Sequence, residues 1–227
     1  MKKLALIVIT LLISCGGGGD GSGDSSSLSA AVLENPCTAI TGSDRFSPRI
    51  INGTACDSSQ SSVVRIFIVN SSSSITGFCS GTVISSNAVL TAAHCLDGNA
   101  ASVIVATNLG NIASSDFTIH PQFNADVSGG IYDVAVIRTT SDLGMPTSSI
   151  LSSRSASNGD QGVLAGFGLD QNGNSGSLRA GTSIVSDTQN LFFDANFDGS
   201  MSNSCTGDSG GPFIIQSGSS FAVAGII

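Results

Sequence analysis

The sequence predicts an all-β protein. Beyond its first apolar stretch, the chain consists of β-branched apolar runs of four to seven residues, separated by Ser, Asn and Gly. Runs of this kind, bounded by turn-forming residues, are typical of β-strands. No segment in this part of the sequence keeps the period of an amphipathic helix. We therefore expect a sandwich or barrel fold, and two barrels because about a dozen strands exceed what one small barrel holds.

The expected strands share Val- and Ile-rich interiors and polar or glycine borders, which suit a pleated and half-buried surface. The clearest runs are residues 63–69, 81–84, 102–105, 134–137, 162–166, 212–215 and 221–227.

The composition argues against a nucleic-acid partner. The chain has 227 residues, enough for a buried core in one large or two small domains, and 41% of them are hydrophobic. Only 11% are charged, and the net charge is -8. A nucleic-acid surface needs a basic patch that neutralises phosphates. The acidic, Ser- and Gly-rich chain is instead typical of a secreted β-rich protein.

The N-terminus predicts export. Two lysines precede an apolar run at 4–13 that is too short to cross a bilayer, which indicates a secretory signal peptide. Its end, Leu-Ile-Ser-Cys at 12–15, resembles the bacterial lipobox, in which the cysteine is lipidated and becomes the first mature residue. We expect a signal peptide at 1–14, lipidation of Cys15 and a flexible Gly/Ser-rich tether at 15–34. An ordinary signal peptide with a chance cysteine is the alternative.

One hydroxyl stands in a setting suited to a nucleophile. Ser209 lies in Gly-Asp-Ser-Gly-Gly, and flanking glycines let backbone amides point at the group that the hydroxyl attacks. A serine nucleophile needs a base, usually histidine, oriented by a third group. Of the two histidines, His94 follows a predicted strand among small residues. His120 precedes Pro121, which holds it extended, and we expect a structural role for it.

Several motifs together resemble those of the chymotrypsin/trypsin-like serine peptidases. The three catalytic motifs of that family are matched, in order, by Thr-Ala-Ala-His-Cys at 91–95, Asp-Val-Ala-Val at 133–136 and Gly-Asp-Ser-Gly-Gly-Pro at 207–212. Lesser matches are the activation site Arg-Ile-Ile-Asn-Gly at 49–53, Cys-Ser-Gly-Thr-Val-Ile-Ser at 79–85, Ile-His-Pro-Gln-Phe-Asn at 119–124 and Gly-Phe-Gly at 166–168, where the family has Gly-Trp-Gly. The resemblance covers residue 50 to the end.

The resemblance implies a serine endopeptidase that acts through an acyl-enzyme intermediate. Ser209 would be the nucleophile, His94 the general base and acid, and Asp133 the group that orients the imidazole. The backbone N–H groups of Gly207 and Ser209 would form the oxyanion hole. No cofactor is expected.

The same resemblance implies two antiparallel six-stranded β-barrels. We expect the peptidase domain at 50–227, with an N-terminal barrel at about 50–145 and a C-terminal barrel at about 146–227, preceded by an activation segment at 35–49.

An α/β-hydrolase is the competing fold, because residues 207–211 also fit its Gly-x-Ser-x-Gly nucleophile elbow. In that fold the order is Ser, acid, His, and a helix follows the serine. Here both histidines precede Ser209 and no helical pattern follows it, so this alternative is excluded.

The resemblance also implies a zymogen. Cleavage after Arg49 would free the Ile50 ammonium, which could pair with the Asp208 carboxylate beside the nucleophile; a simple turn-forming role for Asp208 is the alternative. The resemblance further places Asn203 at the base of the primary specificity pocket, where trypsin-like enzymes carry Asp to hold Arg or Lys. Because a neutral amide lacks that charge, we expect no strong Arg or Lys preference and a different protease for the cleavage after Arg49.

The cysteines indicate disulfides in an exported chain. Excluding Cys15 leaves five, and the resemblance assigns Cys79–Cys95. Cys37 and Cys56 remain as a pair that flanks the activation site, so cleavage would leave the activation segment attached.

The resemblance implies that Cys205 pairs with a cysteine beyond the last residue given, Ile227. We therefore expect the sequence to be a fragment, with an incomplete second barrel.

A metal site is not favoured. Asp194, Asn196 and Asp198 resemble half of a calcium loop, but a plain polar loop is the preferred interpretation because the EF-hand glutamate position falls on Cys205.

Two functions of different class stay open. The first is a monomeric, lipid-anchored endopeptidase of the bacterial cell envelope, on its periplasmic or cell-surface face, that meets protein or peptide substrates and an activating protease. The second is a truncated or non-catalytic protease-like binding module.

Overall fold

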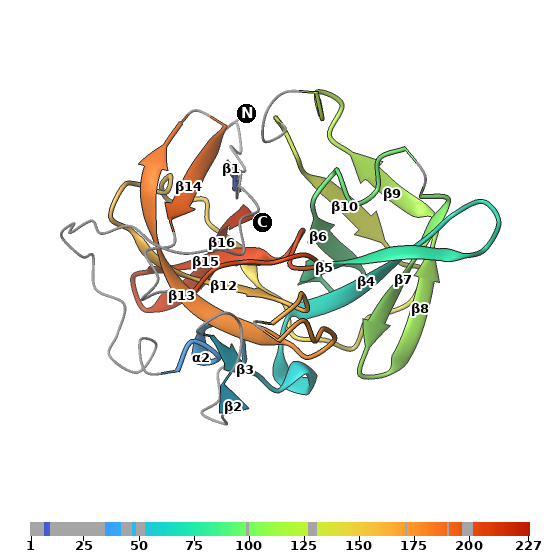
Figure 1. The fold of residues 1–227 in the computed structure, drawn as a ribbon, viewed down its shortest axis with the longest axis horizontal. Coiled ribbons are helices and arrows are strands. Elements are labelled where there is room, and N and C mark those ends of the chain that lie inside the picture. The colour runs from blue at the N-terminus through green and yellow to red at the C-terminus, as the bar shows by residue number, and fades with distance from the viewer. Residues whose placement is uncertain are drawn as a thin grey trace.

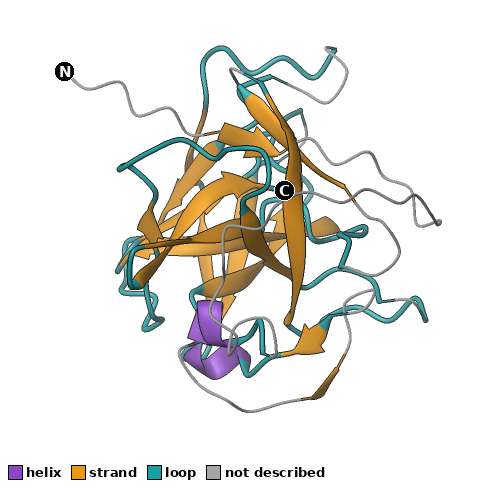
Figure 2. Cartoon of the chain, turned by 90° about the vertical axis from the view of Figure 1, so that its left-hand side faces the viewer, coloured by secondary structure: helices purple, strands orange, loops and turns teal. Residues whose placement is uncertain are grey.

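The protein is built almost entirely of strands arranged in two curled sheets. The computed structural model describes residues 7–9, 35–41, 47–48, 53–98, 100–126, 131–170, 172–189, 191–196 and 202–227. Within these residues the only helical segments are α2 (Thr38–Thr41) and the 3-10 turn η1 (Ser58–Gln60). The two sheets lie side by side (Figure 1), and the all-β prediction is confirmed. Figure 2 shows both helical turns together at one end of the molecule.

The first sheet closes on itself as a barrel. Its strand order is β8-β7-β4-β5-β6-β10-β9, and every pairing is antiparallel. Only Ser115 separates β8 from β9, so these two form one interrupted strand that joins the ends of the sheet and makes a six-stranded ring. The strands are β4 (Val63–Val69), β5 (Ile75–Ser85), β6 (Ala88–Thr91), β7 (Ser102–Thr107), β8 (Gly110–Ser114), β9 (Asp116–Ile119) and β10 (Ala135–Arg138).

The second sheet also forms a ring, with the order β12-β15-β16-β1-β14-β13 and a further pairing of β12 with β13. The strands are β11 (Ser149–Ile150), β12 (Gln161–Gly166), β13 (Arg179–Thr188), β14 (Phe192–Asn196), β15 (Pro212–Ser217) and β16 (Ser220–Ile226). Strand β1 (Ile7–Ile9), within the expected signal peptide, runs parallel to both β14 and β16. The short strands β2 (Ser47–Pro48) and β3 (Thr54–Ala55) extend the sheet from β13, although β3 falls in the range expected for the first barrel.

The two barrels share a buried apolar core. One continuous cluster includes Val63 and Ile66 of the first barrel together with Val163, Ile214 and Val223 of the second. Burial of this apolar surface is the main favourable term that holds the barrels together. A second cluster fills the far side of the second barrel, and there the rings of Phe193 and Phe213 meet edge to face with centroids 5.2 Å apart.

The described residues contain two disulfides. Cys79 of β5 is bonded to Cys95, which follows β6, and Cys37 beside α2 is bonded to Cys56 beside β3. These are the two pairings expected from the sequence. Closing loops of 16 and 19 residues stabilises the folded chain by roughly 3 kcal/mol for each disulfide in the chain-entropy account.

No helix within the described residues has the length and apolar character that a membrane crossing requires.

Candidate active site

The loop that carries Ser209 lies where the two barrels meet. It immediately precedes β15 of the second barrel, and the carbonyl of Ser209 accepts a 2.8 Å hydrogen bond from the amide of Ser80 on β5 of the first. Gly210 takes a φ of 82°, and a Cβ at this position would overlap Thr91 and the carbonyl of Ser80. A glycine after Ser209 is therefore required by both backbone conformation and space.

Strand pairing brings His94 and Asp133 together. Residue Ala135, at the start of β10, pairs with Thr91, at the end of β6, so His94 and Asp133 occupy the same edge of two neighbouring strands. The Nδ1 atom of His94 lies 2.6 Å from Oδ2 of Asp133, and the backbone N–H of His94 donates to Oδ1 at 2.8 Å. Both carboxylate oxygens thus hold the histidine.

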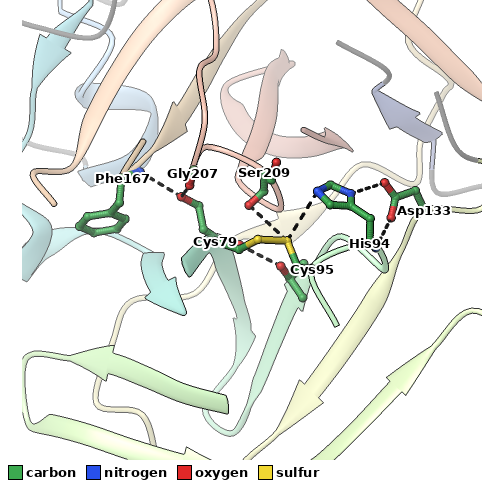
Figure 3. Close-up of a disulfide and its surroundings, with 9 residues drawn as sticks. Cys79, His94, Cys95, Asp133, Phe167, Gly207 and Ser209 are labelled. Carbon is green, nitrogen blue, oxygen red and sulfur yellow. Dashed lines mark hydrogen bonds and ion pairs between the residues drawn. A yellow bond between two sulfur atoms is a disulfide. The ribbon is translucent and has the colours of Figure 1, made fainter. Parts of the chain in front are cut away.

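This contact fixes the tautomer of the imidazole. A buried carboxylate that accepts from Nδ1–H leaves Nε2 without a proton and ready to accept one. The Asp133 side chain is 9% exposed and the His94 side chain 43% exposed, so the imidazole opens to solvent while the carboxylate does not. Figure 3 shows the His94 ring between Asp133 and Ser209.

The Cys79–Cys95 disulfide lies beneath both His94 and Ser209. The Sγ atom of Cys95 is 3.8 Å from Nε2 of His94 and 3.8 Å from the carbonyl oxygen of Ser209 (Figure 3). No hydrogen bond joins Ser209 Oγ to His94 Nε2 in the described structure, and such bonds are often long in unliganded sites. Cys79, His94 and Cys95 form a cluster with metal-ligand spacing, but the disulfide leaves no thiolate for a metal.

Two backbone amides beside Ser209 are available to a ligand. Among the described residues, the N–H groups of Gly207 and Ser209 have no hydrogen-bond partner. The carbonyl of Thr206 accepts from Leu169, and that of Asp208 accepts from Gly211. Because N–H and C=O point in opposite directions across a trans peptide, these bonds turn both free amides away from the protein interior. The pair can stabilise an oxyanion formed at Ser209.

Ser80 is a site residue that the sequence did not reveal. Its hydroxyl donates to the carbonyl of Gly207 and accepts from the amide of Phe167, both at 2.9 Å, and its side chain is fully buried. Gly207 itself has a φ of 97° and packs so closely on the Phe78 ring that a Cβ would overlap it. Ser80 and Phe78, both on β5, therefore shape the backbone that presents the Gly207 amide.

The Asp208 carboxylate is buried next to the proposed nucleophile. It is 3% exposed, and its two oxygens accept from the amides of Gly168 at 2.8 Å and Cys205 at 2.9 Å. A Cβ at Gly166 or Gly168 would overlap Asp208, so glycines are needed on both sides of Phe167. Burial raises the pKa of Asp208 to about 6, against the lowering effect of the two amides and of Arg179.

A buried ion pair supports the segment that binds Asp208. Arg179 at the start of β13 lies 3.0 Å from the Asp170 carboxylate, and both side chains are buried. Asp170 also accepts from the amides of Asn172 and Asn174, and the Asn174 amide makes the largest contribution to holding the pKa of Asp170 below its ordinary value. The pair thus fixes the chain just after Gly168.

Comparison with known proteins identifies the family of this arrangement. A model of the trypsin family matches residues 50–227. The chain belongs to the trypsin family. It is 31% identical over 163 residues to trypsin alpha and 29% identical over 164 residues to trypsin iota, both of Drosophila melanogaster. These matches cover 60% and 61% of this chain, and the chain spans 62% and 64% of the length of the two relatives.

Asn203, the residue expected at the base of the specificity pocket, lies within the described part of the chain. Asn203 is buried, and its Oδ1 accepts from the amide of Ser204 at 2.9 Å. Arg49, Ile50 and Cys15 lie outside the described residues.

The calcium candidates do not form a described site. Asp194 belongs to strand β14 rather than to the polar loop that the sequence suggested, because residues 192–196 pair with β13. Burial, with a smaller effect from the Asp187 carboxylate, raises the pKa of Asp194. The Asn196 side chain and Asp198 lie outside the described residues.

The burial of Asp208 predicts a pH-dependent contribution to stability. Its pKa rises from 3.8 to about 6 on folding of the uncleaved chain. The folded state therefore binds the proton more tightly than the unfolded state. The protonated Asp208 carboxyl contributes stability below pH 4, and this contribution is lost as the pH rises through 6. Two pKa units correspond to at most about 3 kcal/mol. We expect the free energy of unfolding of the uncleaved chain, relative to Asp208→Asn, to fall between pH 4 and pH 7 in urea titrations.

Asp126→Asn, at an exposed carboxylate, is the matched control. A difference between the unsubstituted chain and Asp208→Asn that stays constant over this pH range would contradict the burial of an ionisable Asp208.

Proposed function

We propose that this chain is the catalytic part of a serine endopeptidase. The observation that carries the proposal is the 2.6 Å contact of His94 Nδ1 with Asp133, near Ser209, whose own amide and that of Gly207 have no hydrogen-bond partner among the described residues. A base, its orienting group, a nucleophile and two oxyanion donors are the parts that acyl transfer requires. Membership of the trypsin family supports the same chemistry and favours peptide substrates.

In this proposal Ser209 Oγ attacks the carbonyl carbon of the scissile peptide bond. Nε2 of His94 takes the hydroxyl proton, and Asp133 stabilises the imidazolium that results. The amides of Gly207 and Ser209 donate to the oxyanion, and one such donor typically lowers the barrier by about 3 to 4 kcal/mol. The imidazolium then protonates the leaving amine, an acyl-enzyme forms on Ser209, and water hydrolyses it by the same steps in reverse.

A fluorophosphonate probe tests this proposal without knowledge of the substrate. The probe forms a covalent bond only with a serine activated by a base and an oxyanion hole. We expect the full chain, cleaved after Arg49, to be labelled, and Ser209→Ala to abolish labelling. We expect His94→Ala to slow labelling by at least about a thousandfold, because the base is lost.

Ser85→Ala, at an exposed serine on β5, is the control and should be labelled normally. A folded, cleaved chain that reacts no faster than its Ser209→Ala variant would refute the peptidase and leave a protease-like binding module.

We propose further that the chain is a zymogen activated by cleavage after Arg49. The support lies in the Asp208 carboxylate, which in the uncleaved chain is buried with two amides and a pKa of about 6. A new ammonium at Ile50 would supply the missing full charge and favour the ionised carboxylate. The neutral Asn203 in the expected specificity pocket favours a separate activating protease, and self-cleavage of pure precursor after Arg49 would contradict that part.

The proposed activation switch, in which the Ile50 ammonium pairs with Asp208, predicts a difference between two variants at the new N-terminus. Ile50→Val keeps a β-branched side chain that can insert, whereas Ile50→Gly loses the apolar contact that holds the ammonium in place. After complete cleavage at Arg49, Ile50→Val should be labelled within about threefold of the unsubstituted rate. Ile50→Gly should be at least about tenfold slower, in line with 1.4 kcal/mol or more of lost apolar contact. Equal rates for both variants would exclude the switch.

We propose that the activated domain stays attached to a membrane. The disulfides indicate an oxidising compartment, and Cys37–Cys56 flanks the cleavage site at Arg49. If Cys15 carries lipid in a bacterial envelope, cleavage alone would not release the domain.

This tether predicts where the cleaved protein is found. After cleavage at Arg49, the catalytic domain should sediment with membranes until a reductant is added, and then become soluble. Cys15→Ser should be soluble throughout. Release of the cleaved domain without reductant would contradict the disulfide tether, whereas sedimentation of the Cys15→Ser chain would contradict the lipid anchor.

A further inference from the structure

The residue before Asp133 has an uncommon backbone conformation. Tyr132 has a φ of 55°, in the left-handed region that bulky side chains avoid. Such a conformation is strained for a residue with a side chain and persists only where surrounding contacts impose it. The contacts that impose it here act on the residue just before Asp133, whose carboxylate contacts His94.

A ring contact holds Tyr132 in this conformation. Its ring is stacked on the imidazole of His120, with centroids 4.7 Å apart and planes 5° from parallel. The Nδ1 atom of His120 accepts a 3.2 Å hydrogen bond from the amide of Gln122, which fixes the rotation of the imidazole. Pro121 restricts the backbone of His120 from the other side. The imidazole is therefore a rigid platform for the tyrosine ring.

Backbone hydrogen bonds tie the same two segments together. The amide of His120 donates to the carbonyl of Val134 at 2.9 Å, and the amide of Val134 donates to the carbonyl of Tyr132 at 2.8 Å. His120 directly follows β9, and β9 pairs with β10 through Ile119 and Ala135. The stacked rings thus close the end of the β9–β10 ladder, and the bond from Val134 to Tyr132 spans Asp133.

We propose that the stack of Tyr132 on His120 is a positioning device that aims the Asp133 carboxylate at His94. This inference rests on the proposed function, because it assigns positioning residues to that same reaction. Asp133 must present Oδ1 to the amide and Oδ2 to Nδ1 of His94 at the same time. A chain free to leave the left-handed conformation at Tyr132 would rotate the carboxylate away from one of these donors.

The proposal is tested by variants that separate the ring from the backbone. Tyr132→Phe and His120→Phe keep two stacked rings. Tyr132→Ala and His120→Ala remove the stack. Tyr132→Gly removes both the ring and the cost of a positive φ, so it should restore stability relative to Tyr132→Ala without restoring the position of Asp133.

The first measurement reads the position of Asp133 without any need for catalysis. The ¹⁵N shifts of histidine ring nitrogens distinguish a proton on Nδ1 from one on Nε2, and the chain has only two histidines. We expect neutral His94 to carry its proton on Nδ1 in the unsubstituted chain, Tyr132→Phe and His120→Phe. Tyr132→Ala, Tyr132→Gly and His120→Ala should show a mixture of the two tautomers.

The second measurement is the rate of fluorophosphonate labelling of the cleaved chain. Displacement of a catalytic group by about 1 Å can cost on the order of a hundredfold. We expect the three variants without the stack to be labelled about 10- to 100-fold more slowly and the two Phe variants to be labelled within about threefold of the unsubstituted rate.

Unchanged tautomers and rates in Tyr132→Ala and His120→Ala would overturn the proposal, as would Tyr132→Phe behaving like Tyr132→Ala. If the unsubstituted chain is not labelled at all, the proposed function fails, and the tautomer measurement still decides whether the stack positions Asp133.

Discussion

The arrangement of the proposed nucleophile loop depends on one buried carboxylate. Asp208 is only 3% exposed, too little for water to solvate its charge, so its two oxygens depend on the amides of Gly168 and Cys205. That requirement holds the loop against Gly168, and the bonds from Leu169 to the Thr206 carbonyl and from Gly211 to the Asp208 carbonyl set the directions of the Gly207 and Ser209 amides. It also leaves no room for side chains at Gly166 and Gly168.

Each barrel contributes a different part of the site. The first barrel supplies His94 and Asp133 from neighbouring strands, and the second supplies Ser209 and the two free amides. Ser80 and the Cys79–Cys95 disulfide, both from the first barrel, contact the loop of the second. The shared apolar core and these polar contacts hold the two halves in register, which acyl transfer requires because its reacting groups tolerate little displacement.

The sequence predicted the all-β fold and named the residues of the candidate site, but few of the contacts that support them. Strands left a local pattern, and His94, Asp133 and Ser209 stood in recognisable motifs. Ser80 looked like any other serine in a strand, because its two partners lie 87 and 127 residues away in the sequence.

Two further features could not be predicted from the sequence, because they too depend on residues that lie apart in the chain. They are the ion pair of Arg179 with Asp170 and the left-handed backbone of Tyr132. Tertiary contacts impose both, and local propensity would argue against a tyrosine at a positive φ. Strands β8 and β9, on either side of Ser115, were not among the predicted runs, because their largely exposed side chains form no apolar run. The Gly-Phe-Gly motif was visible, but only the structure explains its glycines through their contact with Asp208.

The most direct test is the titration of the Asp208 carboxyl group before and after cleavage at Arg49, followed by ¹³C NMR of labelled aspartate. The account predicts a pKa of about 6 in the uncleaved chain and a clearly lower pKa once the Ile50 ammonium is paired with the carboxylate. The same pKa in both forms would contradict the central claim that this buried carboxylate is the acceptor of the new N-terminus.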